Sequence, residues 1–236
     1  MVKQNRLIMN KNKVREYSFI DIEGSIYKIS CDWVLGFFEG DGTFIIQLKP
    51  NKSHRLGYQL ILKFEVYQSG IDKNILEAVR VYLNCGKVVL SQKDINSSRT
   101  VYKYSITDLK SIRNKLYPLL KNCSMITSKK YNDLKIFLAV LNIKYPVLDK
   151  DYCPNKTIQN NKLTINEIDL KKILELRDKL SSKLNKLDLP IVSSNPSPDW
   201  IVAFTDAEGN FYVKINKSSK LKYRIITCFS ISQEKS

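Results

Sequence analysis

The stretch DWVLGFFEGDGTF at residues 32–44 returns near the other end of the chain as DWIVAFTDAEGNF at residues 199–211. Both copies begin with Asp-Trp, continue as an apolar helical segment, and end in an acid followed by glycine. The acids Asp41 and Glu208 occupy the same place in the two copies, 167 positions apart. A pseudo-two-fold pairing of the copies would bring two carboxylates together at one axis, which is one way to build a metal site.

Each copy also carries two small residues four positions apart, Gly36 and Gly40 in the first and Ala203 and Ala207 in the second. Residues at this spacing share one helix face, so two such helices could approach with their backbones nearly touching. We expect the glycine after each acid to give the chain the freedom to leave the helix and enter a strand. A single copy would fit a glycine-rich core helix equally well, but two matching copies favour a paired site.

The charge of the chain points to a polyanionic partner. Thirty-nine Lys and Arg against 23 Asp and Glu give a net charge of +16, which favours nucleic acid over a role in solubility alone. The longest apolar runs, such as residues 136–143, are too short to cross a bilayer, so no membrane partner is expected.

Residue usage narrows the possible chemistry. His54 is the only histidine, which removes most catalytic triads and histidine metal clusters and leaves carboxylates to carry any reaction. The five cysteines are widely spaced and contain no CxxC pair. We therefore expect free thiols rather than a disulfide framework or a zinc site.

The alternation of residues 44–68 predicts a β-hairpin with one apolar face, and helical spacing follows Ser69. Strands are expected at 87–91 and 100–106, then helices starting at Thr107 and capped by Ser128. A further helix is expected to start at a capping box of Thr164 and Glu167. The order helix-ββ-helix-ββ-helix-helix makes one complete unit.

The duplication extends beyond the motif, because the hairpin pattern recurs with its turn shortened by two residues. The predicted regions are a basic N-terminal extension at 1–30, a first half at 31–145, a connecting loop, helix and linker at 146–198, and a second half beginning at 199. Only three residues follow Gln233, the counterpart of Gln68, so we expect this second half, 199–236, to be incomplete.

These residues resemble the LAGLIDADG homing endonucleases in their double-motif, single-chain form. The resemblance runs from about Asp32 to Gln233 and includes the stretch YSITDLK at residues 104–110. It implies an α+β fold of pseudo-two-fold αββαββα units, whose concave antiparallel sheets form a saddle for DNA.

The resemblance also implies the site residues. Divalent cations, Mg²⁺ or another such as Mn²⁺, would be held by Asp41 and Glu208 and by the carbonyls of Gly40 and Ala207. The catalytic set would add a water-organising glutamine in each half, Gln68 and Gln233, and a supporting lysine, Lys110. No small-molecule cofactor is implied. We interpret Glu39 and Asp206, two residues before the acids, as capping or packing groups.

The polar faces of the two hairpins are the expected DNA-reading surface, because a β-ribbon can enter the major groove. Alternation assigns to this surface a set of mostly polar side chains from both copies: Gln47, Lys49, Asn51, Gln59, Lys63, Glu65, Tyr67, Lys214, Asn216, Arg224, Ser230 and Ser232.

The leading hypothesis is a site-specific double-strand DNA endonuclease of intron homing, which hydrolyses phosphodiesters with metal at a long target site. The alternatives are an RNA maturase that assists splicing of a group I intron, and an inactive truncated remnant. A monomer is expected if the second half is complete. The abundance of Lys, Asn, Ile and Tyr suggests an AT-rich genome, so the expected location is the mitochondrion, with the chloroplast as alternative.

Overall fold

The computed structural model describes residues 18–20, 26–93, 100–122, 125–144, 166–181, 195–217 and 222–232. The first half consists of α1 (Cys31–Asp41), β3 (Gly42–Pro50), β4 (Tyr58–Ser69), α2 (Lys73–Leu83), β5 (Lys87–Lys93) and β6 (Thr100–Ile106). It continues with α3 (Leu109–Ser111), a π-helical turn (Ile112–Leu116), α4 (Tyr117–Asn122) and α5 (Ser128–Lys144). This order matches the predicted unit.

The remaining elements are α6 (Glu167–Ser181), α7 (Pro198–Glu208), β7 (Gly209–Lys217) and β8 (Tyr223–Ile231), with a short hairpin of β1 (Ser18–Ile20) and β2 (Ile26–Lys28) before α1. Helices and antiparallel sheets are mixed along the chain, which confirms the predicted α+β class. No helix in the described ranges combines the length and apolarity needed to span a membrane.

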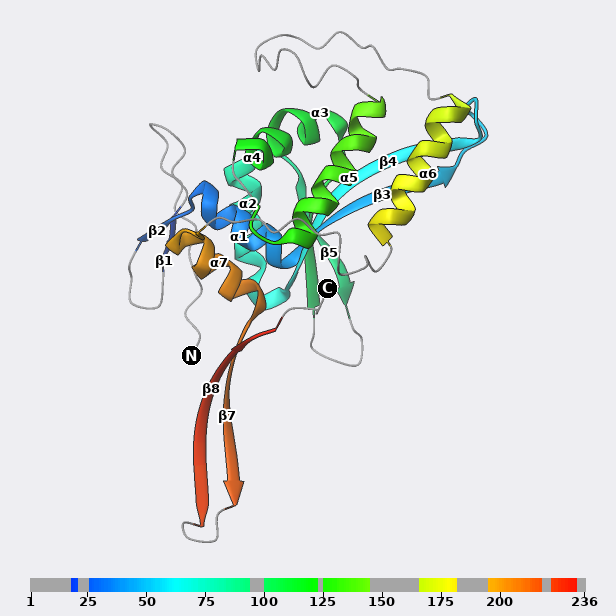
Figure 1. Ribbon diagram of the computed structural model, residues 1–236. Helices are drawn as coiled ribbons and strands as arrows, with labels where there is room; N and C mark the ends of the chain where they lie inside the picture. Colours follow the sequence, from blue (N-terminus) through cyan, green and yellow to red (C-terminus); the bar gives the residue numbers. More distant parts are fainter. Residues whose placement is uncertain are drawn as a thin grey trace.

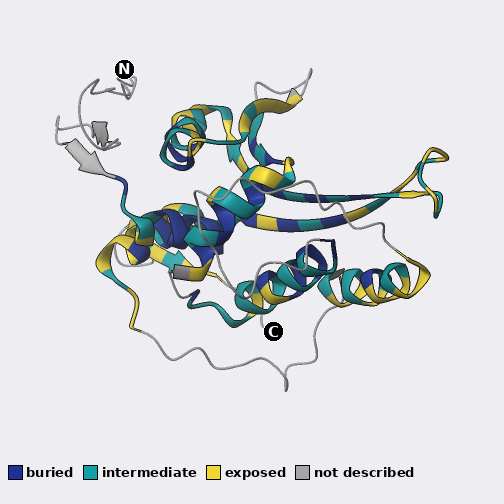
Figure 2. Ribbon diagram, turned by 90° about the horizontal axis from the view of Figure 1, so that it is seen from above, coloured by how far each residue is buried: buried dark blue, intermediate teal, exposed yellow. Residues whose placement is uncertain are grey.

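The main sheet has the strand order β3-β4-β6-β5, with every pair antiparallel. Its inner face packs against helices including α1, α2 and α5 and forms the core, where Phe64 and Tyr104 are fully buried. Figure 2 shows buried segments in the helices and in the strands beside them, while the far tip of the β3–β4 hairpin is exposed. The opposite face of the sheet, called here the open face, carries the polar residues of the alternation.

The helices of the two motif copies, α1 and α7, lie side by side (Figure 1). Both have 11 residues and the same cap, since Ser30 accepts a hydrogen bond from the Trp33 amide and Ser197 accepts one from the Trp200 amide. A Cβ added to Gly36 would lie 2.4 Å from the Trp200 carbonyl oxygen. The predicted close approach of the two backbones is therefore confirmed.

The glycines that follow these two helices are required because a side chain would not fit there, and not because the backbone needs unusual dihedral angles. Gly42 has φ −71° and Gly209 has φ −75°, values that any residue adopts. A Cβ would lie 2.4 Å from the Phe38 carbonyl oxygen at Gly42, and 2.3 Å from the Thr205 carbonyl oxygen at Gly209. The expectation that conformational freedom selects glycine here is wrong.

The second hairpin repeats the first in register. Lys49 pairs with Gln59 in β3–β4, and Asn216 pairs with Arg224 in β7–β8. Figure 1 shows β7 and β8 projecting away from the rest of the molecule. Both faces of this hairpin are largely exposed, including its apolar side chains: Phe211, Val213, Ile215, Ile225, Phe229 and Ile231.

Three predicted helix starts shift by one or two residues. Asp108, rather than Thr107, caps α3 by accepting from the Ser111 amide at 2.7 Å. Ser128 is the first residue of α5 rather than its cap. The capping box of α6 uses Asn166 and Asp169, which exchange hydrogen bonds of 2.8 and 3.1 Å between side chains and amides. Thr164 of the predicted box lies outside the described residues.

The bonding state of the cysteines agrees only in part with the prediction that all of them are free thiols. Cys85 and Cys228 are free, as predicted. Cys31, at the first position of α1, is disulfide-bonded. Widely spaced cysteines give no sequence signal of a pairing that only the folded chain brings about, so the prediction of free thiols throughout is wrong at this position.

Candidate active site

The two acids of the motif meet at the ends of α1 and α7. A Cβ added to Gly40 would lie 2.4 Å from the Ala207 Cβ and 3.3 Å from the Glu208 Cγ, so the last turns of the helices touch. Burial, and then the negative charge of Glu208, raise the pKa of Asp41 to about 6. The predicted juxtaposition of Asp41 and Glu208 is therefore present in the structure.

Gln68 joins this pair from β4. Its Nε2 donates a hydrogen bond to Oδ2 of Asp41, which favours the ionised carboxylate and fixes its orientation. The strand register explains the reach, because β4 pairs Val66 with Gly42, the residue after Asp41. The corresponding Gln233 lies outside the described residues.

A lysine that the sequence reasoning missed, Lys130, completes the cluster. Its Nζ donates a hydrogen bond to the carbonyl oxygen of Gly42, and its ammonium group interacts electrostatically with the carboxylates of Asp41 and Glu208. Burial lowers the pKa of Lys130, while these acids and Asp133 oppose that effect. The first turn of α5 holds two lysines, Lys129 and Lys130, which the helix dipole disfavours at that end, but the sequence does not distinguish the one that reaches the acids.

Lys110, the lysine implied by the resemblance, occupies a different place. It is exposed in α3, which begins after the end of β6. Gln68 pairs with Tyr102 at the other end of that strand. The structure thus brings Lys130, and not Lys110, to the acids.

Glu39 has a structural role, which confirms its interpretation as a capping or packing group. It is almost fully buried and accepts hydrogen bonds from the amides of Ile126 and Thr127, just before α5. It also accepts one of 2.9 Å from Nε1 of Trp200, which ties α7 to the same carboxylate. Its counterpart Asp206 is exposed, and partial burial followed by the charge of Asp72 raises its pKa.

The donor set at the helix ends fits a hard divalent cation. Two carboxylates share this site with the positive charge of Lys130, which leaves excess negative charge when both acids are ionised. Oxygen ligands, including carboxylates and main-chain carbonyls, are those that magnesium and calcium prefer. In the described ranges no group of three or more His, Cys, Asp or Glu side chains forms a metal site, so the carbonyls of Gly40 and Ala207 would have to contribute.

Most of the residues predicted to read DNA lie on the strand face that alternation assigned to them, but Asn51 lies in the turn after β3 and Ser232 follows the end of β8. In the first half, Gln47, Lys49 and Tyr67 are exposed, and Asn51, Gln59 and Lys63 are half-buried. Glu65 is buried, with 4% of its surface exposed, although it is on the open face. In the second half Ser230 is half-buried, and the others are exposed: Lys214, Asn216, Arg224 and Ser232.

Comparisons with known proteins agree with this geometry. The sequence model of the LAGLIDADG endonuclease family matches residues 34–141. Probable intron-encoded endonuclease 3 of Neurospora crassa is 31% identical over 209 residues, covering 85% of this chain and 37% of that protein. The uncharacterised mitochondrial protein RF1 of Saccharomyces cerevisiae is 29% identical, covering 98% of this chain and 40% of that protein. The chain thus spans about two fifths of the length of these relatives.

Solved structures share the same fold. The structure of I-SmaMI bound to its uncleaved DNA target in the presence of calcium ions aligns with a TM-score of 0.70 and 22% identity. The alignment covers 87% of this chain and 68% of that one. With the family match over the first half, the relatives and this common fold, the chain belongs to the LAGLIDADG endonuclease family.

Proposed function

We propose that the chain carries the active site of a site-specific double-strand DNA endonuclease of intron homing, which hydrolyses phosphodiesters with a divalent metal. The observation that carries the proposal is the meeting of Asp41 and Glu208, one acid from each motif copy, at the ends of two touching helices. Two equivalent acids at one axis suit a reaction on two antiparallel strands.

Each residue of the cluster has a distinct role in this proposal. Asp41 and Glu208, with the carbonyls of Gly40 and Ala207, would hold Mg²⁺ or a similar ion. Such an ion supplies an activated water and stabilises charge on the leaving oxygen. Gln68 orients Asp41 through their hydrogen bond. Lys130 places a positive charge beside the acids, where it can attract the scissile phosphate.

The open faces of the two hairpins would hold the target duplex. The net charge of +16 favours binding of DNA through counterion release. The mitochondrial relative and the composition of the chain support an origin in a mitochondrial genome. In this proposal the DNA-reading set and the division into a first half at 31–145 and a second beginning at 199 stand as predicted.

The test uses a plasmid that carries the intron insertion site, which is the sequence of the two exons that flank the intron encoding this chain, joined without the intron. With Mg²⁺ the protein should convert the plasmid to linear DNA, and EDTA should prevent this. Asp41→Asn should slow cleavage by ~100-fold or more, because metal catalysis contributes several kcal/mol to the barrier.

Glu77→Gln provides the matched control. It makes the same acid-to-amide change on α2, where Glu77 pairs with Arg80 at 2.8 Å on the surface. The control should cleave at the wild-type rate. Unchanged cleavage by Asp41→Asn would contradict the assignment of the site.

A further inference from the structure

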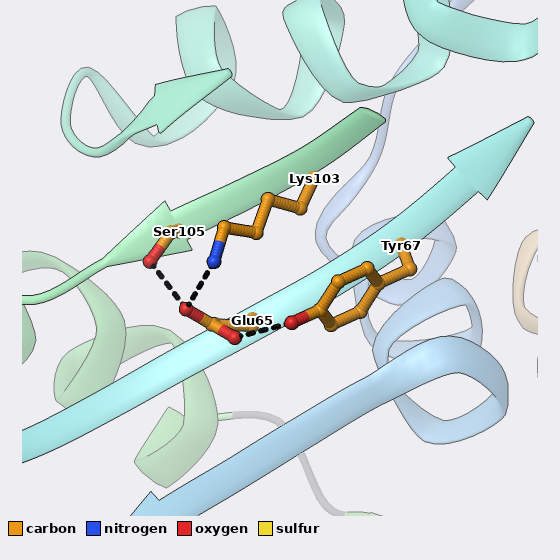
Figure 3. Close-up of polar contacts among 4 residues, drawn as sticks. All are labelled: Glu65, Tyr67, Lys103 and Ser105. Carbon is orange, nitrogen blue, oxygen red and sulfur yellow. Dashed lines mark hydrogen bonds and ion pairs between the residues drawn. The ribbon is translucent and has the colours of Figure 1, made fainter. Parts of the chain in front are cut away.

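Four side chains on the open face of the main sheet form one hydrogen-bonded cluster, drawn in Figure 3. Glu65 lies at its centre, and its Oε2 accepts a hydrogen bond of 2.6 Å from the Tyr67 hydroxyl on the same strand. Its Oε1 accepts two bonds of 3.1 Å, from Nζ of Lys103 and from Oγ of Ser105 on β6. Both oxygens of this buried carboxylate are therefore already engaged by neighbouring side chains.

The protonation states in this cluster are well defined at neutral pH. Burial raises the pKa of Glu65, but the bonds from Tyr67, Lys103 and Ser105 outweigh it and hold that pKa below its ordinary value. The bond to Glu65, with some burial, raises the pKa of Tyr67 to about 12. Glu65 is thus an ionised acceptor, and Tyr67 is a neutral donor to it.

This arrangement decides how Tyr67 can meet a ligand. A tyrosine hydroxyl has one proton and two lone pairs, and the proton of Tyr67 is committed to Glu65. Tyr67 is 40% exposed on the open face, and its oxygen keeps its lone pairs for a ligand that approaches from that side. Toward the outside, Tyr67 is therefore a hydrogen-bond acceptor.

An acceptor at this place distinguishes between bases. In the major groove cytosine and adenine present an exocyclic amino donor, whereas guanine and thymine present acceptors. We propose that Glu65 is a positioning residue that fixes Tyr67 as an acceptor, so that Tyr67 reads A or C at one position of the DNA target. This inference rests on the proposed function, since it requires duplex DNA against the open face.

Lys103 fits the same role as a neighbouring contact. One of its three donors is used by Glu65, and its ammonium lies 5.8 Å from the centre of the Tyr67 ring. An ammonium that Glu65 holds there can reach a base or phosphate acceptor next to the amino group that Tyr67 reads. Lys103 was not among the residues that the sequence reasoning assigned to DNA.

An isosteric substitution should reverse the preference. In Glu65→Gln the amide oxygen would take the place of Oε1, where Lys103 and Ser105 both donate. The amide nitrogen would then face Tyr67 and donate to its oxygen, which turns the Tyr67 proton outward. Tyr67 would become a donor and favour G or T. Tyr67→Phe should remove the preference while leaving the ring and Glu65 in place.

The experiment starts from a pool of duplexes with a randomised stretch, selected by binding to the wild-type protein with Ca²⁺ in place of Mg²⁺. All four bases are then tested at each position of the selected sequence, and dissociation constants are measured for wild type, Glu65→Gln and Tyr67→Phe. At one position the wild type should favour A or C by about tenfold, the effect of about 1.4 kcal/mol from one good contact. Glu65→Gln should favour G or T there, and Tyr67→Phe neither.

The outcomes separate the inference from the proposed function. Glu77→Gln, the same acid-to-amide change away from the sheet, should keep the wild-type preference at every position. If Glu65→Gln and Tyr67→Phe both keep the wild-type preference for A or C, the inference is wrong. It is also wrong if both variants weaken binding equally for all sequences, because Glu65 would then only join β4 to β6. A wild-type protein that selects no sequence would overturn the proposed function and the inference together.

Discussion

The hairpins that follow the two motif helices have the same strand register but opposite burial. Phe44 pairs with Phe64 in β3–β4, and Phe211 pairs with Phe229 at the equivalent place in β7–β8. The ring centroids of the two pairs are 5.2 and 4.7 Å apart. Phe64 is fully buried, whereas Phe229 is 53% exposed.

This difference in burial shows that the residue pattern of a strand determines the hairpin and its register, whereas burial depends on the elements packed against it. Alternation of apolar and polar residues and a short turn are enough to define the hairpin and its register. Burial needs other elements, and for β3–β4 these include α1, α2 and α5. The first half of the duplication should therefore carry most of the stability of the chain, while the second contributes mainly its acid and its contact with α1.

The largest difference in stability is expected when the equivalent residues Phe64 and Phe229 are each replaced by alanine. Phe64→Ala should lower the free energy of unfolding by about 3–5 kcal/mol, because it opens a cavity in the core. Phe229→Ala should change it by less than about 0.5 kcal/mol, because the ring is already half in water. Urea unfolding of each variant measures both quantities. A similar loss at both positions would show that the apolar face of β7–β8 is covered in solution.

The second test compares the equivalent acids Glu39 and Asp206. Glu39→Ala should cost about 3 kcal/mol, because it leaves the amides of Ile126 and Thr127 and the Trp200 indole without their buried acceptor. Asp206→Ala should stay within about 0.5 kcal/mol, as expected for an exposed side chain. The midpoint of thermal unfolding provides the readout. Equal losses would mean that Asp206 also serves as a buried acceptor.

Much of the fold follows from local pattern. The motif repeat predicted that α1 and α7 touch, and the alternation predicted β3, β4, β7 and β8 with their common register. Both predictions depend on residues close in sequence, whose spacing fixes a face or a register. The positions of Asp41 and Glu208 followed from the same repeat.

Other features depend on contacts that no local pattern encodes. Lys130 reaches the carbonyl of Gly42 only because α5 packs beside β3, 88 residues away in sequence. Glu65 was predicted to face DNA directly, and its burial arises from two partners on β6, a strand that alternation alone does not place next to β4. Such long-range packing decides which of several candidate lysines or acids belongs to a site.

The smallest expected effect concerns the contact between the two halves. Gly40→Ala places a methyl group 2.4 Å from the Ala207 Cβ, so the helix ends must separate. Overpacking of this kind costs about 1–3 kcal/mol, and it should also slow DNA cleavage, because Asp41 and Glu208 move apart with the helices. Ala207→Gly alone should be milder, since it removes a methyl group without introducing a clash.

The double variant Gly40→Ala with Ala207→Gly tests whether contact distance is the cause. Exchanging the two residues moves one methyl group from α7 to α1 and leaves the same number in the contact. Stability and cleavage rate should then recover toward wild type, which gives a coupling free energy opposite in sign to the loss from Gly40→Ala. If the losses simply add, Gly40 acts within α1 alone, and the two copies of the motif do not depend on each other for the distance between their acids.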